Sequence, residues 1–171
     1  MQEHFLATDY YLEISNIKGE CTDARHKDWI ELVEFSLGLQ HAVTGSLSSG
    51  GSHFSERADF KLFTLTKTID AGTPKLFLFC AKGTPIPKLT VHLCRATGEK
   101  ATYMAYIFEN SHVQGFTSLS ERTNGQNLPM ERIAFSYAKL TVEYFKTDHA
   151  SARLLGSGGK TFWDQTTNAG G

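Results

Sequence analysis

The sequence is poor in several features that would each point to a particular class of protein. Its three cysteines, Cys21, Cys80 and Cys94, are widely separated and form no C-x-x-C pair. Neither a disulfide framework nor a zinc site is therefore indicated, and buried or loop thiols are the better interpretation. Lys and Arg number 17 against 18 Asp and Glu, for a net charge of -1, so no general electric field favours nucleic acid or an anionic membrane.

Long apolar runs are absent too. No run approaches the ~20 apolar residues of a membrane-spanning helix, and the start, MQEHFLATDYYLEI, lacks the basic segment and apolar core of a secretory signal. We therefore expect a chain that is made and folded in the cytoplasm, without membrane insertion. At 171 residues, a single domain over 1–171 is large enough to fold without disulfides or metals.

Catalytic and metal-binding motifs are equally scarce. No G-x-S-x-G elbow occurs, and the seven histidines form no H-x-x-x-H or H-x-H pair. Cys21 and His26 fall in a predicted turn, a setting that favours an ordinary turn over an activated thiolate. His92 stands opposite the apolar parity of its strand, which predicts a solvent-facing or barrel-surface residue rather than a ligand. We expect no cofactor, no metal and no enzyme activity.

A glycine-rich segment, GGKT over 158–161, looks like the end of a phosphate-binding loop. Leu154 stands where the first glycine of that motif is required, however, and no long helix follows. We expect a flexible run-in over 154–160 that acts as a hinge before a terminal strand, with Trp163 as the anchor.

The sequence is rich in alternation of apolar and polar residues with a period of two, which is typical of strands with one face on a core. In the strand predicted over 29–39, one side carries Val33, Phe35, Leu37 and Leu39, and the other carries Glu34, Ser36 and Gly38. Further strands are predicted over 10–14, 60–69, 88–96, 101–110, 113–120 and 132–146.

The strand predicted over 132–146 changes phase in its middle. One parity holds Ile133, Phe135 and Tyr137, whereas the other holds Ala138, Leu140, Val142 and Tyr144. A β-bulge or sharp bend near Tyr137 and Ala138 would keep both sets on one core.

Two segments depart from the β pattern. DAGTPKLFLFCAKG predicts a short helix with Thr73 as N-cap, Pro74 in the first position and Gly83 at the exit. Its apolar run over 76–80 predicts a helix largely buried against the sheet or a neighbouring subunit. The segment Thr44–Asp59, rich in glycine and serine, predicts a long loop that docks on another surface, because such loops are usually functional or disordered.

Together these patterns predict a mainly β fold, a barrel or sandwich. The specific expectation is a β-barrel of two antiparallel sheets with one short α-helix packed on the side and a long extended loop.

The segment YYLEISNIKGECTDARHKDWIELVEFSLGLQ resembles the N-terminal signature of the haemolysin-coregulated protein (Hcp) family, the tube subunits of the type VI secretion system. Its signature turn is carried here by Gly19, Glu20, Thr22, Asp23 and His26. The similarity continues through the glycine-rich loop, the Thr-Pro-capped helix and the strand FSYAKLTVEY. Departures from the family pattern are Cys21, where serine or threonine is usual, and Leu37, where tryptophan is commoner.

The resemblance implies a ring of six barrels, stacked into a tube inside a contractile sheath and expelled with a tip spike. The implied partners are further copies of the chain, the sheath and spike proteins, and small effector proteins inside the ring. The chain is then cytoplasmic when assembled and later secreted without a signal peptide. No catalysis is implied.

Two surfaces follow from this resemblance. The side chains expected to line the lumen are those of Glu34, Ser36 and Gly38, although alternation alone leaves bulk solvent as the alternative. The loop is expected to reach the adjacent ring, with candidate contacts at Leu47, Ser48, Gly50, Gly51 and Phe54; the alternative is a flexible surface loop. Two other functions stay open: a monomeric β-barrel that binds a small ligand, and a secreted effector or toxin.

Overall fold

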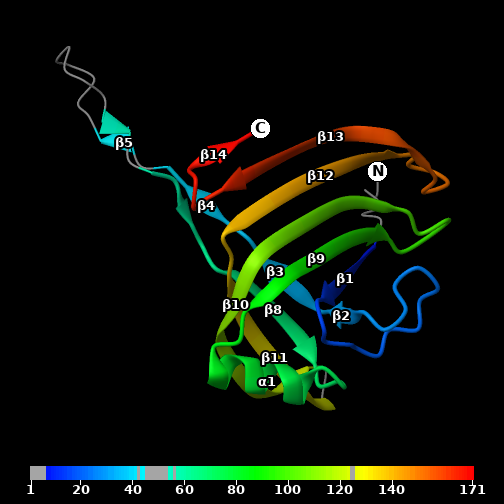
Figure 1. Ribbon diagram of the computed structural model, residues 1–171. Coiled ribbons are helices and arrows are strands. Elements are labelled where there is room, and N and C mark those ends of the chain that lie inside the picture. The colour runs from blue at the N-terminus through cyan, green and yellow to red at the C-terminus, as the bar shows by residue number, and fades with distance from the viewer. Residues whose placement is uncertain (1–6, 42, 45–53, 56, 124–125) are drawn as a thin grey trace.

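The computed structural model describes residues 7–41, 43–44, 54–55, 57–123 and 126–171. Two antiparallel sheets share one long strand and curve around a common core (Figure 1). Sheet A has the strand order β14 (Ala169–Gly170), β13 (Leu154–Asp164), β12 (Lys139–Thr147), β10 (Thr102–Thr123), β9 (Ile86–Arg95), β1 (Thr8–Ile14) and β2 (Ile30–Leu32). Sheet B has the order β10, β11 (Gln126–Ser136), β8 (Phe63–Thr68) and β3 (Glu34–Ser36). The predicted fold class is confirmed.

The core lies between the two sheets and is filled by large side chains. Phe63, from sheet B, stacks on Phe108 of β10 with ring centroids 4.5 Å apart, and Phe135 stacks on Phe63 from the other side at 6.0 Å. All three rings are fully buried. Buried aromatic pairs of this kind add stabilisation beyond the apolar area that they remove from water.

The predicted bend near Tyr137 and Ala138 is confirmed. β11 ends at Ser136 in sheet B, and β12 begins at Lys139 in sheet A, so the chain turns a corner between the sheets. Tyr137 is buried there, and its hydroxyl donates a hydrogen bond to the Lys61 carbonyl at 3.0 Å. Of the residues predicted to face the core after the bend, Leu140 is buried but Tyr144 is exposed.

The strand predicted over 29–39 is broken at Val33. β2 belongs to sheet A and β3 to sheet B, and the Val33 amide between them donates to the Thr66 carbonyl at 2.9 Å. Because the chain changes sheets there, the inward parity shifts by one residue. Phe35 and Leu37 pack on the core as expected, but Val33 and Leu39 are exposed, so the prediction was wrong for these two.

Several strand limits differ from the sequence prediction. The two strands predicted over 101–110 and 113–120 form the single bent strand β10, and β11 begins at Gln126, before its predicted start. The predicted hinge over 154–160 is wrong, because these residues belong to β13, which is hydrogen-bonded to β12. Gly158 is required at this point, since a Cβ there would lie 2.9 Å from Cε1 of Tyr144. Trp163 anchors the strand as a half-buried residue.

The helix α1 (Thr73–Lys82) forms where the sequence predicts it, but Gly72 occupies the N-cap position instead of Thr73. The Thr73 hydroxyl donates to Glu131 Oε2 at 2.9 Å. Gly83 ends the helix in the left-handed conformation, as predicted. The expectation of a largely buried helix is wrong for this chain alone, because Phe77 and Leu78 are 59% and 43% exposed.

The predicted loop over 44–59 is paired at its base into an arm. β4 (Leu39–Gln40) pairs with β7 (Asp59–Phe60), and β5 (Val43–Thr44) pairs with β6 (Phe54–Ser55). The paired segments project away from the two sheets (Figure 1). Of the predicted contacts, Leu47, Ser48, Gly50 and Gly51 lie outside the described residues, and Phe54 is placed by its backbone in β6. Within the described ranges, no helix has the length and apolar character needed to cross a bilayer.

Candidate functional site

The signature turn, residues 17–29, is held closed by its own backbone hydrogen bonds. The Gly19 amide donates to the Asp28 carbonyl at 2.8 Å, and the Cys21 amide donates to the Trp29 carbonyl at 3.0 Å. A Cβ on Gly19 would lie 2.7 Å from the Trp29 carbonyl carbon and 2.8 Å from Ile30 Cα. Only glycine allows the two segments to approach this closely.

The turn lies over the outer face of sheet A and covers a second, small core. Tyr11 of β1 and His92 of β9 are register neighbours on that face. Cys21 from the turn and Cys94 from β9 are buried beside Tyr11, with Trp29 packed against them. The turn is therefore a covering layer on the sheet rather than a free loop.

His26 is the central residue of this covering layer and is only 2% exposed. Its ring stacks on the Tyr11 ring at 4.2 Å, with an interplanar angle of 9°, and meets Trp29 edge-on at 4.8 Å. His26 Nδ1 lies 2.9 Å from Asp23 Oδ1, and His26 Nε2 lies 3.0 Å from His92 Nδ1. Both ring nitrogens of His26 therefore have partners.

The environment shifts the titration of the groups around His26. The hydrogen bond from His26 lowers the pKa of Asp23, which keeps this carboxylate ionised. Burial, together with the nearby charge of His26, lowers the pKa of His92 to about 4. His92 lies on the outer face of sheet A, as the prediction of a solvent-facing or barrel-surface residue allows, but it is half-buried because the turn from 66 residues earlier in the chain packs on it.

The two thiols in this cluster are not activated. Burial raises the pKa of Cys94, and burial also raises the pKa of Cys21, so both thiols stay protonated at neutral pH. Over the described ranges, no group of three or more His, Cys, Asp or Glu side chains is arranged to hold a metal ion. Of the signature residues, Gly19, Asp23 and His26 lie together in the cluster, whereas Glu20 and Thr22 are exposed.

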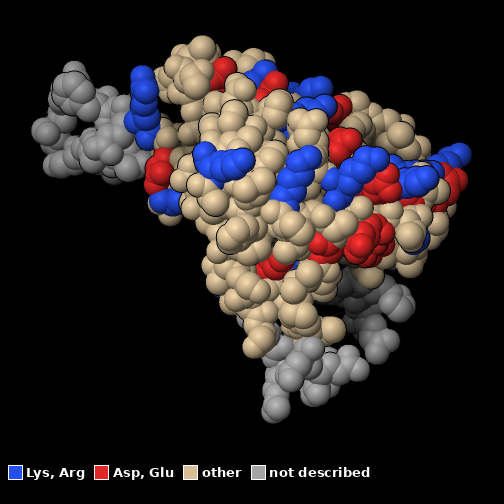
Figure 2. All heavy atoms as spheres, turned by 60° about the horizontal axis from the view of Figure 1, so that its bottom comes forward, with Lys and Arg blue, Asp and Glu red and all other residues tan. Residues whose placement is uncertain are grey.

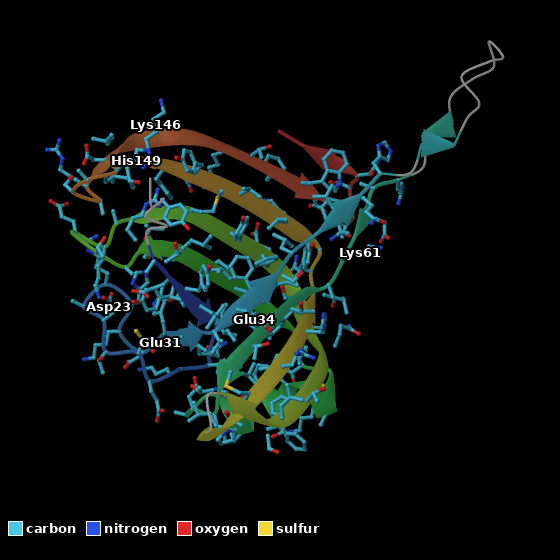
Figure 3. All side chains as sticks on the ribbon, turned by 180° about the vertical axis from the view of Figure 1, so that it is seen from behind. Asp23, Glu31, Glu34, Lys61, Lys146 and His149 are labelled. Carbon is cyan, nitrogen blue, oxygen red and sulfur yellow. The ribbon has the colours of Figure 1, made fainter. Side chains whose placement is uncertain are left out.

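A second site is the outer face of sheet B around β3, which we call the β3 face. Figure 3 shows Glu34 on β3, apart from Asp23 in the signature turn and Glu31 on β2. Glu34 and Ser36 are exposed there, and Thr66 donates its hydroxyl hydrogen to Glu34 Oε1 at 2.9 Å. Gly38 follows the end of β3 and is half-buried, with its carbonyl accepting from the Lys61 amide at 2.9 Å.

The register extends the β3 face across the whole of sheet B. Two rows of neighbours cross the strands from β3 to β10: Glu34, Thr66, Arg132 and Thr117 in one row, and Ser36, Thr64, Ala134 and Gly115 in the other. All eight are polar or small. Sequence reasoning missed the members on β8, β10 and β11, although the alternation in FTLTKT carries the signal for the two threonines.

An apolar cavity of about 450 Å³ lies between the base of the arm and the last strands of sheet A, and it was also missed. Its apolar lining includes Leu39, Phe60, Leu140, Val142, Phe162 and Trp163. The cavity is built from segments some 100 residues apart in the chain, so no local pattern could indicate it.

Charges of both signs lie close together on one face of the chain. Figure 2 shows Lys and Arg side chains interleaved with Asp and Glu across part of that face. Exposed ion pairs such as Lys18 with Asp28, at 3.3 Å, contribute little to stability. Over the described residues of that face, the mixed charges do not provide a continuous basic tract for a nucleic acid.

Comparison with known proteins places these features in a family. Residues 11–144 match the family described as "Type VI secretion system effector, Hcp". Protein hcp1 of Pseudomonas aeruginosa is 25% identical over 140 residues, which cover 81% of this chain and 84% of that protein.

Solved structures give the same result for the fold. A structure of a type six secretion system protein superposes with a TM-score of 0.87 at 29% identity, covering 96% of this chain and all of the other. Hcp1 from Salmonella typhimurium superposes with a TM-score of 0.75 at 21% identity, covering 96% of this chain and 99% of the other. The match over residues 11–144, which includes the signature turn and strands of both sheets, shows that the chain belongs to the Hcp family of the type VI secretion system.

Proposed function

We propose that the chain is a subunit of the type VI secretion tube. Six copies close into a ring, rings stack into a tube inside a contractile sheath, and a spike protein caps the tip. The ring is then secreted, and its lumen carries and protects small effector proteins. The family membership and the shape of the chain, a compact barrel with a projecting arm, support this proposal.

The β3 face carries the lumen assignment. One side of sheet B covers the core with rings such as Phe63 and Phe135, while the other side presents two rows of small and polar residues. A pore wall along which protein cargo moves needs this character, because large exposed apolar patches would bind the cargo by burial. We assign Glu34 and Ser36 to the lumen, with Gly38 at its margin near the arm.

Two other features fit subunit contacts. Phe77 and Leu78 are exposed side by side on α1, and a neighbouring subunit that covered them would remove an apolar patch from water. The arm, which projects from the barrel, is the segment that we assign to the adjacent ring. Of the predicted contact residues, Phe54 belongs to β6, and the others precede it in the sequence.

A ligand-binding barrel is less well supported. The space between the sheets is filled by Phe63, Phe108 and Phe135, none of which is exposed, so the barrel interior holds side chains where a ligand would have to sit. The thiols of Cys21 in the turn and Cys94 on β9 are protonated and buried, which gives no support to a hydrolytic toxin.

The ring is tested by mass and shape. We expect light scattering to give a particle of six times the 19.0 kDa chain mass, and negative-stain images to show annular particles with an open centre. Compact particles of one chain mass at every concentration would contradict the proposal.

The lumen assignment is tested at Ser36. Ser36→Trp should lower retention of a co-expressed effector by about tenfold or more, because the larger indole side chain blocks the lumen while leaving the core untouched. Ser157→Trp, at an exposed position on β13 in sheet A, is the matched control and should retain the effector normally. Equal retention in the two variants, with both folded by circular dichroism, would place Ser36 outside the lumen.

A further inference from the structure

The contact between His26 and His92 is the main polar link between the signature turn and sheet A. His26 Nε2 and His92 Nδ1 lie 3.0 Å apart, and the two rings are perpendicular at 88°. Trp29 packs against the His92 ring at 4.7 Å and against the His26 ring at 4.8 Å. The turn therefore rests on the sheet through a pair of titratable rings and their aromatic neighbours.

We propose that the His26–His92 contact is an acid-operated latch, which holds the turn over residues 17–29 on sheet A at neutral pH and releases it in acid. The open form exposes the small core of Tyr11, Cys21 and Cys94 that the turn otherwise covers. This goes beyond the tube proposal and does not depend on it.

The proton count explains the latch. Asp23 is ionised, so His26 donates its Nδ1 hydrogen to Asp23 Oδ1 at 2.9 Å. A single hydrogen then lies between His26 Nε2 and His92 Nδ1, donated by one ring and accepted by the other. Once both rings carry a full proton, two N–H groups face each other across 3.0 Å. The sulfur of Cys94, 3.8 Å from His26 Nε2, is only a weak acceptor and does not replace the lost hydrogen bond, so the contact opens.

The charged groups near the pair come from the turn and from β1. Asp23, which is hydrogen-bonded to His26, and Asp9 on β1 carry negative charge close to the neighbouring Cys94, and Arg25 from the turn carries positive charge there. The groups packed closest are neutral: the ring of Tyr11 on β1 and the thiols of Cys21 and Cys94. Glu31 of β2 is a register neighbour of Tyr11 and interacts with the Cys21 thiol. On the other side of His92, the register neighbour on β10 is Ala105, and the neighbour of Ala105 on β12 is Glu143.

The direction of the pH effect follows from His92. Its pKa in the closed form is lowered from the ordinary value of 6.5 to about 4, mainly by burial. Between pH 4 and pH 6.5, His92 therefore binds a proton in the open form but not in the closed form. The closed form is fully favoured above pH 6.5 and loses this advantage as the pH falls towards 4, so the opening constant should rise by about tenfold per pH unit in this window.

The test measures opening through the buried thiols in the full-length chain. In a Cys80→Ser background, only Cys21 and Cys94 react with 4,4′-dithiodipyridine, which labels thiols even in acid. Rates are taken from pH 7.5 to 4.5 and divided by those of the denatured chain at the same pH, with far-UV circular dichroism showing that the sheets stay folded. We expect the corrected rate to rise by roughly two orders of magnitude over this range.

His92→Asn is the decisive variant, because its side-chain amide can donate a hydrogen bond to His26 Nε2 or accept one from it but does not titrate. The corrected rate should then be almost independent of pH, while His149→Asn, at an exposed histidine, should behave like the wild type. Equal slopes in wild type and His92→Asn would overturn the latch. If His92→Asn does not fold, the His92 Cε1 proton shift in the wild type decides: a midpoint near 6.5 with the thiols still protected overturns it, and a midpoint near 4 or coincident with thiol exposure supports it.

Discussion

Lys67→Met is expected to lower the free energy of unfolding by about 3–5 kcal/mol, because it leaves a buried carboxylate without its cation. Lys67 is completely buried, and its Nζ lies 2.9 Å from Glu131 Oε2 and 2.7 Å from Asp70 Oδ1. Glu131 is itself only 1% exposed. Without the lysine, its remaining partner is the Thr73 hydroxyl, which cannot balance a negative charge in the protein interior.

A double variant separates the pair from the loss of packing. Lys67→Met with Glu131→Leu removes both charges, so it should be more stable than Lys67→Met alone, as measured by urea unfolding followed by circular dichroism. Lys61→Met provides a control, because Lys61 pairs with Asp59 in an exposed setting and should lose less than about 1 kcal/mol. A loss below 1 kcal/mol in Lys67→Met would show that Glu131 is neutralised or hydrated in another way.

Gly19→Ala is expected to cost about 3 kcal/mol, since the added methyl group meets backbone that cannot move aside. Its Cβ would approach the Trp29 carbonyl carbon to 2.7 Å, in the segment that closes the turn. The turn would have to open to relieve this contact. Urea unfolding should report the loss of stability, and faster labelling of Cys21 and Cys94 should report the opening at neutral pH.

Gly38→Ala serves as the matched control. The nearest atom to a Cβ at Gly38 is the flexible Lys61 Cγ at 3.8 Å, an ordinary contact. This variant should therefore stay within about 0.5 kcal/mol of the wild type. If both glycine variants had equal stability, close approach at Gly19 would not be what requires a glycine in the turn.

Alternation of apolar and polar residues was sufficient to predict most strands and the corner at Tyr137. It also identified Glu34 and Ser36 as outward-facing, because a strand with one buried face exposes every second residue. It failed at Val33, where the chain leaves one sheet for the other. The change of sheet is fixed by the backbone hydrogen bond from the Val33 amide to the Thr66 carbonyl, which joins residues far apart in sequence.

The partial burial of His92 and the N-cap of α1 were not predicted, for a similar reason. His92 follows the outward parity of its strand, as predicted, but the turn around His26 covers that face, and no local pattern reports the covering. Thr73 has the right residue type for an N-cap, yet its hydroxyl donates a hydrogen bond to Glu131 on β11 instead. Long-range contacts therefore decided both outcomes against local propensity.

The arm shows a further limit. Its ladders are two residues long on each strand, and a ladder as short as that between β4 and β7 leaves no periodic pattern to detect. The glycines of the GGKT segment were interpreted as a hinge, but they belong to β13. Gly158 lies close to Tyr144 of β12, and Gly159 has a positive φ of 138°, so both requirements depend on the pairing of β13 with β12.

The pairing of β1 with β9 also bears on how the chain folds as it is made. β1 pairs with β2 on one side, but Tyr11 also pairs with His92, so the other edge of β1 must wait for a partner about 80 residues further along the chain. At a synthesis rate of roughly 5–20 residues per second, β1 and the turn that follows stay without β9 for several seconds. The hairpin of β9 and β10 forms from neighbouring residues and can supply the edge onto which β1 docks. The signature turn, which is the most recognisable part of the sequence, therefore reaches its final place only after the middle of the chain has been synthesised.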